Sequence, residues 1–476
     1  MSRSRAKLFI ENFLAYGLIN ALNKLVPLLM LPVVTRLLTD TAEFGRFDMF
    51  NTIISFGSSI AVLGIYDAMF REYFEKDDLG YRRKVTSIAL KIVFVSSIII
   101  TIILIMFNGA FSQVFLGDSQ SGFIVIMAAI GVFLSANSVI ISAPTRIQNK
   151  RKIYIVSGLL NSITYYLLAI GLILLGFGYK GMIYANLVAA TTILVFFIFL
   201  NRKHFDLNIF DKNIAKELFI IGLPLLPTFI IYWVFNSMDK IMIANMIGLA
   251  QVGIYSIGAR VASVSNFIYI AFAGGWQYFA FSTMKDKDQV GLTSKVFEYL
   301  GMISFSVFFL AIPFYKYVFQ IFFTGEYILG ESVFPYLFLC PLLLILFQTA
   351  GSQFLIVKKS YLITMSLIIG VLINVVLNYF LIQIYGIKGC ALATLIGYSL
   401  STLIIVIMTI RERLLKIRWK FVVACIITII TIIKIFFFDD IFSNYFALAG
   451  ILIILGLYYK DLKLIKKLLP MKHQDR

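Results

Sequence analysis

The sequence has little charge and few of the side chains on which catalysis and metal binding depend. Only 14% of its 476 residues are charged, where soluble proteins have about 25%, and 60% are hydrophobic. The three cysteines, Cys340, Cys390 and Cys425, form no C-x-x-C pair, and the two histidines are His204 and His473. We therefore expect neither a disulfide framework nor a zinc site, no histidine-based active site and no cofactor.

Nucleotide-binding and glycosyltransferase signatures are also missing. The sequence has no G-x-x-x-x-G-K-[ST] motif and no polar segment long enough for a nucleotide-binding domain, which argues against ATP hydrolysis by this chain. Asp286-Lys287-Asp288 resembles a glycosyltransferase D-x-D motif, but it lies in a short charged loop with no catalytic domain around it. The chain is expected to move a substrate rather than convert it, and so not to be an enzyme.

Long hydrophobic runs dominate the sequence instead. Each is close to the roughly 20 residues that a helix needs to cross a membrane, and none alternates as a barrel strand would. We predict an all-α polytopic membrane protein with about 14 transmembrane helices. The runs cover residues 12–34, 45–68, 86–107, 122–143, 154–175, 181–201, 218–238, 252–282, 295–320, 333–356, 361–383, 388–410, 420–438 and 444–459.

The distribution of positive charge predicts the orientation. With both termini on the cytoplasmic side, most of the 42 Lys and Arg residues fall in the termini and cytoplasmic loops, as the positive-inside rule requires. Few fall in the opposite loops, among them Lys240. The net charge of +18 is thus explained by membrane topology and anionic lipids, and no nucleic-acid partner is expected.

Three short segments recur 208 residues further along the chain. Shared residues include the pairs Gly45/Gly253, Gly117/Gly325 and Gly178/Gly386, and they cluster in corresponding loops at one constant spacing. The recurring segments are TDTAEFGRF (39–47) with IGLAQVGIY (247–255), FSQVFLGD (111–118) with FQIFFTGE (319–326), and GFGYKGMIYANL (176–187) with IYGIKGCALATL (384–395).

These segments indicate two copies of one six-helix unit. Six spans per copy give both copies the same orientation, an arrangement found in transporters that bind substrate between the two halves. We predict an N-terminal bundle at 1–208, a second bundle at 209–415, and a helix pair with a tail at 416–476. Duplication without transport, as in channels or structural proteins, is the weaker alternative. The glycine loop at 176–187 and its copy are expected to be structural turns.

Two cations are predicted deep in the membrane, one in each copy. Lys24 lies near the middle of the first span, and Arg260 lies roughly 12 Å inside the eighth. Such cations cost several kcal/mol unless they face water or a counter-charge, so they predict an electropositive cavity for an anionic substrate. The alternative is structural pairing with a carboxylate. The candidates for that pairing are Asp48, Asp67, Asp239 and Glu298.

Asparagine and proline residues complete the candidate site. Asn20 shares a helical face with Lys24, and Asn266 lies near Arg260 on the same span. Pro27 and Pro32 should bend or break the first span and release the carbonyl of Asn23. Pro224 and Pro227 predict a second broken helix. The substrate-binding candidates are Lys24, Arg260, Asn20, Asn23 and Asn266, and the coupling or gating candidates are Asp239, Lys240, Pro27 and Pro224.

The sequence resembles polysaccharide flippases of the O-antigen type, in the multidrug/oligosaccharidyl-lipid/polysaccharide exporter superfamily. The resemblance covers essentially the whole chain, although Lys24 matches no family position. It rests on Asn20, Pro27, Leu31-Pro32, Thr35-Arg36, Leu38 and Phe44-Gly45, on Asn236, Asp239-Lys240, Gly253, Tyr255, Ala259 and Arg260, and on Gly386, Lys388-Gly389, Ala391 and Ala393.

This resemblance implies two six-helix bundles around a central cavity, in a bacterial inner membrane. It implies transfer of an undecaprenyl-pyrophosphate-linked oligosaccharide from the inner to the outer leaflet, with membrane lipids and polysaccharide-assembly proteins as further partners. Lys24 and Arg260 would contact the diphosphate. Two alternatives remain: a cation-coupled multidrug exporter of the same superfamily, which would favour carboxylates over cations at mid-membrane, and a membrane scaffold without transport.

Overall fold

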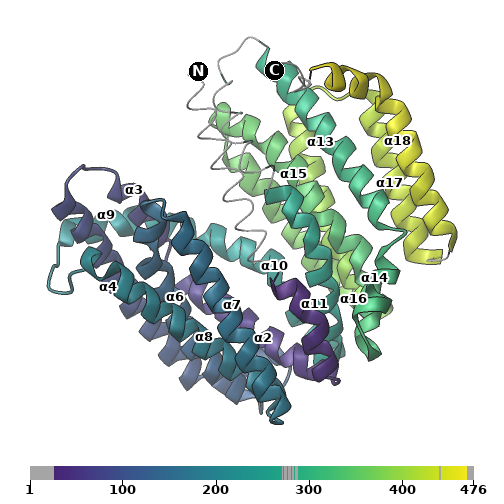
Figure 1. Cartoon of the computed structure of the whole chain (residues 1–476). Helices are drawn as coiled ribbons and strands as arrows, with labels where there is room; N and C mark the ends of the chain where they lie inside the picture. Colours follow the sequence, from purple (N-terminus) through teal and green to yellow (C-terminus); the bar gives the residue numbers. More distant parts are fainter. Residues whose placement is uncertain are drawn as a thin grey trace, which may run out of the picture. The chain divides into compact units, whose positions relative to one another are not determined.

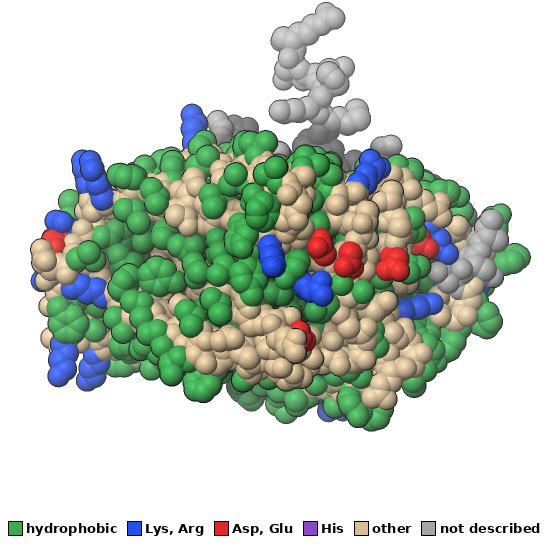
Figure 2. All heavy atoms as spheres, turned by 90° about the horizontal axis from the view of Figure 1, so that it is seen from below, with side chains coloured by type: hydrophobic (Ala, Val, Ile, Leu, Met, Phe, Trp, Pro, Cys, Tyr) green, Lys and Arg blue, Asp and Glu red, His purple; other side chains and the backbone are tan. Residues whose placement is uncertain are grey.

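The computed structural model describes residues 26–270, 272, 276, 280, 284, 288–438 and 441–468. These residues form helices joined by short turns, and no strand occurs among them (Figure 1). Ten helices are long and apolar enough to cross a membrane, or eleven if α2 (Thr41–Ala61) and α3 (Ile65–Tyr73), bent by 48°, form one span. Hydrophobic side chains cover much of the face shown in Figure 2. The predicted fold class is confirmed.

The predicted count of fourteen spans is not reached within the described residues. Two predicted runs, 12–34 and 252–282, extend into residues that the structure does not describe. Two others, 361–383 and 388–410, form the two arms of α16 (Tyr361–Arg411), whose backbone leaves the helical conformation at Gly386. The count of fourteen therefore stays a prediction.

The arms of α16 turn back on each other. At 51 residues, a straight α16 would be about 76 Å long, far more than the ~30 Å hydrocarbon core. A Cβ added to Gly370 would lie 1.9 Å from Ser401 Oγ and 2.7 Å from the Gly397 carbonyl oxygen. The two arms are therefore in close contact, and each corresponds to one of the two predicted spans.

The chain forms two compact units by its internal contacts. The first contains the described residues up to Arg260 together with Phe323–Gly330 and Ile373–Ala393; the second contains Val261–Phe322, Glu331–Leu372 and the described residues from Thr394 onward. The division at 208 and 415 concerns the sequence repeat and stays a prediction.

The first unit is a helical bundle with several shorter helices at its ends. In Figure 1, α4, α6, α7 and α8 run alongside one another, and α2 packs against α6 and α8. The elements are α2, α3, α4 (Leu79–Met106), α5 (Asn108–Leu116), α6 (Gly122–Ile147), α7 (Arg151–Leu174), α8 (Gly178–Asn201), η1 (Arg202–His204), α9 (Lys212–Gly222), η2 (Leu223–Leu225), α10 (Leu226–Ile247) and most of α11 (Leu249–Ala262), preceded by a helix at Val26–Leu37.

Side-chain caps mark where helices of the first unit begin. Asp40 precedes α2 and accepts a hydrogen bond from the Ala42 amide at 2.8 Å. Asp78 does the same for α4, accepting from the Tyr81 amide at 2.6 Å. Such caps satisfy amides that have no partner inside the helix. The Asp40 cap fixes the residue at which α2 begins, and α2 carries the central residue of the candidate site.

The second unit is organised around α13 (Gln289–Ala311) and α15 (Phe334–Ile356), with α17 (Trp419–Phe438) and α18 (Ile441–Leu468) packed on α13. Its main ion-pair cluster lies just before α17. The Arg418 side chain bonds Glu298, which is 2% exposed, and also Asp461 at 3.1 Å. Lys420 contacts Asp461 at 3.1 Å as well. Glu298, a predicted counter-charge for the deep cations, pairs instead with Arg418. The unit also contains η3 (Ser263–Ser265), α14 (Tyr315–Phe322) and the end of η4 (Gly325–Val333), most of which lies in the first unit.

The repeated glycine loops have matching backbone conformations. Gly178 and Gly386 have φ values of +52° and +58°, and Gly117 and Gly325 have φ values of +73° and +61°. Residues with a Cβ rarely take positive φ, so each pair uses glycine for the same turn. This agreement between positions 208 residues apart supports the predicted repeat.

Candidate functional site

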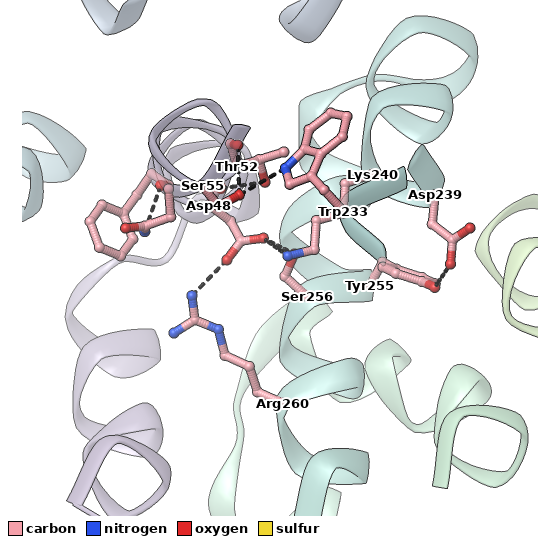
Figure 3. Close-up of polar contacts among 11 residues, drawn as sticks. Asp48, Thr52, Ser55, Trp233, Asp239, Lys240, Tyr255, Ser256 and Arg260 are labelled. Atoms are coloured by element: carbon pink, nitrogen blue, oxygen red, sulfur yellow. Dashed lines mark hydrogen bonds and ion pairs between the residues drawn. The ribbon is translucent and has the colours of Figure 1, made fainter. Parts of the chain in front are cut away.

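A buried carboxylate in the first unit holds two cations. Asp48 on α2 lies 2.6 Å from Lys240 Nζ on α10 and 2.6 Å from Arg260 Nη2 on α11 (Figure 3). Ser256 Oγ donates a further hydrogen bond to Asp48 at 2.8 Å. The Asp48 side chain is 3% exposed, whereas Lys240 and Arg260 are 23% and 34% exposed. Three helices therefore meet at one carboxylate, and we name Asp48, Lys240, Arg260 and Ser256 the charge cluster.

The helical periodicity of α2 and α10 extends this contact by two turns. Trp233 precedes Lys240 by seven residues, and Ser55 follows Asp48 by seven, so each pair shares one face of its helix. Trp233 Nε1 donates a hydrogen bond to Ser55 Oγ at 2.9 Å (Figure 3). The two contacts show that α2 and α10 run antiparallel along this face.

Close packing of α2 against α11 brings Arg260 within reach of Asp48. A Cβ on Gly45 would lie 2.0 Å from the carbonyl oxygen of Leu249, and a Cβ on Gly253 would lie 2.0 Å from that of Thr41. Thr41 and Leu249 are themselves 208 residues apart, as Gly45 and Gly253 are. The two repeat-equivalent helices thus cross through reciprocal glycine contacts, and only glycine at both positions permits this approach.

The charge cluster carries a net positive charge, because two cations share one carboxylate. A buried ion requires pairing and hydrogen bonds to offset its desolvation, and Asp48 has both. Arg260 also lies over the ring of Phe44, with 5.0 Å between its guanidinium carbon and the ring centroid. Partly exposed cations with planar or compact donor groups suit phosphate oxygens, which accept charge-assisted hydrogen bonds.

Asp239 belongs to a second polar group beside the charge cluster. It is adjacent to Lys240 on α10, but the two side chains point in different directions in Figure 3. Tyr255 donates its hydroxyl to Asp239 at 2.6 Å, and Asn378 Nδ2 donates at 2.7 Å. All three side chains are buried. Among the described residues, no group of three or more His, Cys, Asp or Glu could hold a metal ion.

Residues in or next to the recurring segments 111–118 and 319–326 form hydrogen bonds with the start of α2 and the end of α10. Thr41 donates a hydrogen bond to Glu326 at 3.3 Å, and the Tyr327 hydroxyl donates to the backbone carbonyl just before α2 at 3.3 Å. Asn245, at the end of α10, donates to the Val114 carbonyl at 2.9 Å. One recurring segment therefore contacts the start of α2, and the other contacts the end of α10.

The structure brings some predicted site residues together and separates others. Arg260, Lys240 and Asp239 lie on neighbouring helices of the first unit, and the carboxylate pairing considered as an alternative for Arg260 is the one it makes. Asn266 follows η3 in the second unit. Lys24, Asn20 and Asn23 lie outside the described residues.

The two proline candidates differ in their surroundings. Pro27 lies in a helix whose described part is Val26–Leu37, and this part continues through Pro32 without interruption. Pro224 lies in the 3₁₀ segment η2 between α9 and α10, and Pro227 lies at the start of α10. A 3₁₀ turn therefore joins α9 and α10, and together they form one candidate span at Lys212–Ile247.

Sequence analysis missed the central position of Asp48 and the reach of Lys240. The hydrophobic run at 218–238 predicts that Lys240 lies in a loop, but α10 continues to Ile247. The repeat offset contained a usable signal. Asp48 and Ser256 are 208 residues apart and hydrogen-bond each other, so equivalent positions of the two copies meet at this point.

Comparison with known proteins identifies the family. A family model described as polysaccharide biosynthesis protein matches residues 33–329. The chain belongs to this family. The resemblance to polysaccharide flippases is thereby confirmed, as is a multi-pass membrane protein with the fold of transporters. No curated protein sequence matches the chain.

Solved structures with the same fold agree with this family. A lipid II flippase MurJ in an inward closed conformation superposes with a TM-score of 0.72 at 15% identity, covering 94% of this chain and 99% of MurJ. An inward-facing multidrug resistance MATE transporter gives 0.60 at 15% identity, covering 83% and 98%. A superfamily transporter from Pyrococcus furiosus gives 0.56 at 15% identity, covering 86% and 95%. At these identities the likeness establishes the fold alone.

Proposed function

We propose that this family member is a flippase for an undecaprenyl-pyrophosphate-linked oligosaccharide, the repeat unit of a surface polysaccharide. It would move this lipid from the inner to the outer leaflet of a bacterial inner membrane by alternating access, with both termini in the cytoplasm. The observation that carries the proposal is the charge cluster, in which two cations share one buried carboxylate and leave a net positive charge where α2, α10 and α11 meet.

The charge cluster suggests how a diphosphate would act. Arg260 and Lys240 are partly exposed, so phosphate oxygens can compete with Asp48 for their donor groups. Binding would then weaken the contacts that join α2, α10 and α11. The polyprenyl tail would remain in lipid, where it is stable, while the sugars and diphosphate cross in a polar environment. Lys24, Asn20, Asn23 and Asn266 remain proposed contacts of the same substrate.

We further propose that the 3₁₀ turn between α9 and α10 accommodates the conformational change. The 3₁₀ segment containing Pro224 lacks regular α-helical hydrogen bonds, so it can bend at lower cost than a continuous helix. Pro27 is a proposed second point of bending. Asp239, held by neutral donors from Tyr255 and Asn378, is the proposed residue for coupling to an ion gradient.

The multidrug-exporter alternative has support from the fold, because MATE transporters share it. The charge cluster favours the flippase, since a cationic drug would be repelled by its excess positive charge. A scaffold without transport predicts that the cations can be neutralised without loss of function.

A deletion strain tests the proposal. Loss of surface polysaccharide, with accumulation of lipid-linked oligosaccharide on the cytoplasmic side, is the expected phenotype. Arg260→Ala and Lys240→Ala should fail to restore it at equal expression, because each removes a diphosphate contact. Lys180→Ala removes an exposed cation in the first turn of α8 and should restore it fully. Normal surface glycan together with new sensitivity to cationic drugs would assign the protein to the multidrug exporters.

A further inference from the structure

The first unit contains a cavity lined by uncharged polar side chains. It has a volume of about 460 Å³ and lies between α2, α6, α7 and α8. About half of its lining side chains carry a hydroxyl or an amide, and none carries a charge. This composition is unusual for helices of membrane-spanning length, where polar side chains tend to mark substrate pathways.

The polar side chains follow regular helical faces. Ser135, Ser138 and Ser142 are spaced by three and four residues on α6, and Ser157 and Asn161 are spaced by four on α7. Residues at this spacing project from one side of a helix. The two stripes line the same cavity, so it is walled by two rows of hydroxyl and amide groups.

Two asparagines close the ring of polar groups from the other helices. Asn51 projects from α2 and Asn186 from α8. Asn51 donates a hydrogen bond to the Phe47 carbonyl at 3.0 Å, which leaves its side-chain oxygen available to a ligand. Four helices therefore present polar groups to one open cavity.

Several of these groups have no hydrogen-bond partner within the described part of the chain. Ser142 and Ser157 donate to carbonyls of their own helices at 3.2 and 3.0 Å. The side chains of Ser135, Ser138 and Asn186 make no such bond there, although all three are half-buried. An amide or hydroxyl removed from water without a partner costs free energy, so these side chains require a polar ligand or water in the cavity.

Aromatic side chains add a second feature of the cavity. Tyr154 on α7 and Phe197 on α8 line it beside Ala190. A sugar ring has hydroxyl groups around its edge and C–H groups on its faces, so it can use both the polar stripes and the aromatic surfaces. A polyprenyl or acyl chain would leave the serine and asparagine groups unsatisfied. A cationic ligand would find no carboxylate in the lining.

We propose that this cavity binds an uncharged sugar residue of the transported lipid-linked oligosaccharide and so contributes to glycan specificity. The inference rests on the proposed flippase function. The volume lies within the ~300–1,000 Å³ typical of small-ligand sites, which is enough to admit one or two sugar rings but not a whole oligosaccharide. The cavity therefore complements the charge cluster, with sugars in the neutral site and the diphosphate at the cations.

Binding to two carrier lipids tests this division. The purified protein in nanodiscs is titrated with glycosylated carrier lipid extracted from the deletion strain and, separately, with undecaprenyl pyrophosphate that carries no sugar. Ser138→Leu and Asn186→Leu fill the cavity with apolar volume, and we expect each to weaken binding of the glycosylated lipid at least about tenfold, the loss of one or two hydrogen bonds. Binding of the sugar-free lipid should be unchanged.

Two controls separate the possible failures. Thr191→Leu makes the same kind of change at an exposed position of α8 and should leave both affinities unchanged. Arg260→Ala should weaken binding of both lipids. If both cavity variants bind the glycosylated lipid as wild type does, or weaken both lipids equally, the sugar site is refuted while the flippase stands. If wild type binds neither lipid, the proposed function itself fails.

Discussion

The pairing of Asp48 with Arg260 gives a quantitative test of the charge cluster. At an effective dielectric constant of about 20, two charges ~4 Å apart attract by about 4 kcal/mol. The Arg260 side chain is 34% exposed and Lys240 shares the carboxylate, so part of this attraction is screened. We expect a coupling energy of about 2 kcal/mol between Asp48→Asn and Arg260→Gln, within the ~0.5–3 kcal/mol typical of residues in contact.

A double-mutant cycle measures this coupling. Each single variant and the double variant are unfolded reversibly in mixed micelles by increasing fractions of SDS, and the free energies of unfolding are compared. The double variant should be clearly more stable than the sum of the single losses predicts, because Asp48→Asn already leaves Arg260 without its carboxylate. The same cycle on Lys359 and Glu412, whose side chains are 41% and 48% exposed at 2.8 Å, should give below about 1 kcal/mol.

Additive losses within about 0.5 kcal/mol at Asp48 and Arg260 would refute the reasoning. Equal coupling energies for the buried and the exposed pair would refute it as well, because burial of the carboxylate would then have no measurable effect.

Three further results are expected from the described contacts. Gly45→Ala should destabilise the protein by about 1–3 kcal/mol, since its Cβ would overlap the α11 backbone. Gly171 has open space around it, so Gly171→Ala should stabilise the protein by up to about 1 kcal/mol. Unfolding titrations of both variants measure these changes. Arg418→Ala should lower stability by about 3 kcal/mol because the buried Glu298 loses its cation, and Glu298→Gln in the same background should recover part of the loss. Hydrogen bonds from a backbone amide and a hydroxyl lower the pKa of the Asp118 carboxyl. The stabilising contribution of Asp118 is therefore present above the ordinary pKa of an aspartate and is lost as pH falls through the lowered pKa. Asp118→Asn should flatten the acid limb of a plot of unfolding free energy against pH.

Much of the fold could be predicted from the sequence because each signal was local. Long apolar runs specify membrane-spanning helices, and the glycines at 178 and 386 specify turns through their own backbone preferences. Pro224 interrupts its helix because it lacks an amide and fixes its own φ. None of these inferences requires knowledge of which helices are neighbours.

The charge cluster could be predicted only by knowing which helices are neighbours, and the sequence shows this only indirectly. A hydropathy profile ends the span before Lys240, because hydropathy takes no account of the Asp48 carboxylate that pairs with Lys240 from another helix. Asp48 was one of four candidate partners for Arg260, and nothing local distinguishes it from Glu298. The choice is made by the close approach of α2 and α11, which is a tertiary contact.

That approach is also reciprocal between two segments that are 208 residues apart in the sequence. Gly45 meets the backbone at Leu249, and Gly253 meets the backbone at Thr41. Because Gly45 corresponds to Gly253 and Thr41 to Leu249, the same contact is made twice, once in each direction. This reciprocity defines an isologous contact, the kind formed by two identical subunits around a two-fold axis. Within a single polypeptide this contact thus has the symmetry of a homodimer interface, except that Asp48 faces Ser256 where two identical segments would place two carboxylates together.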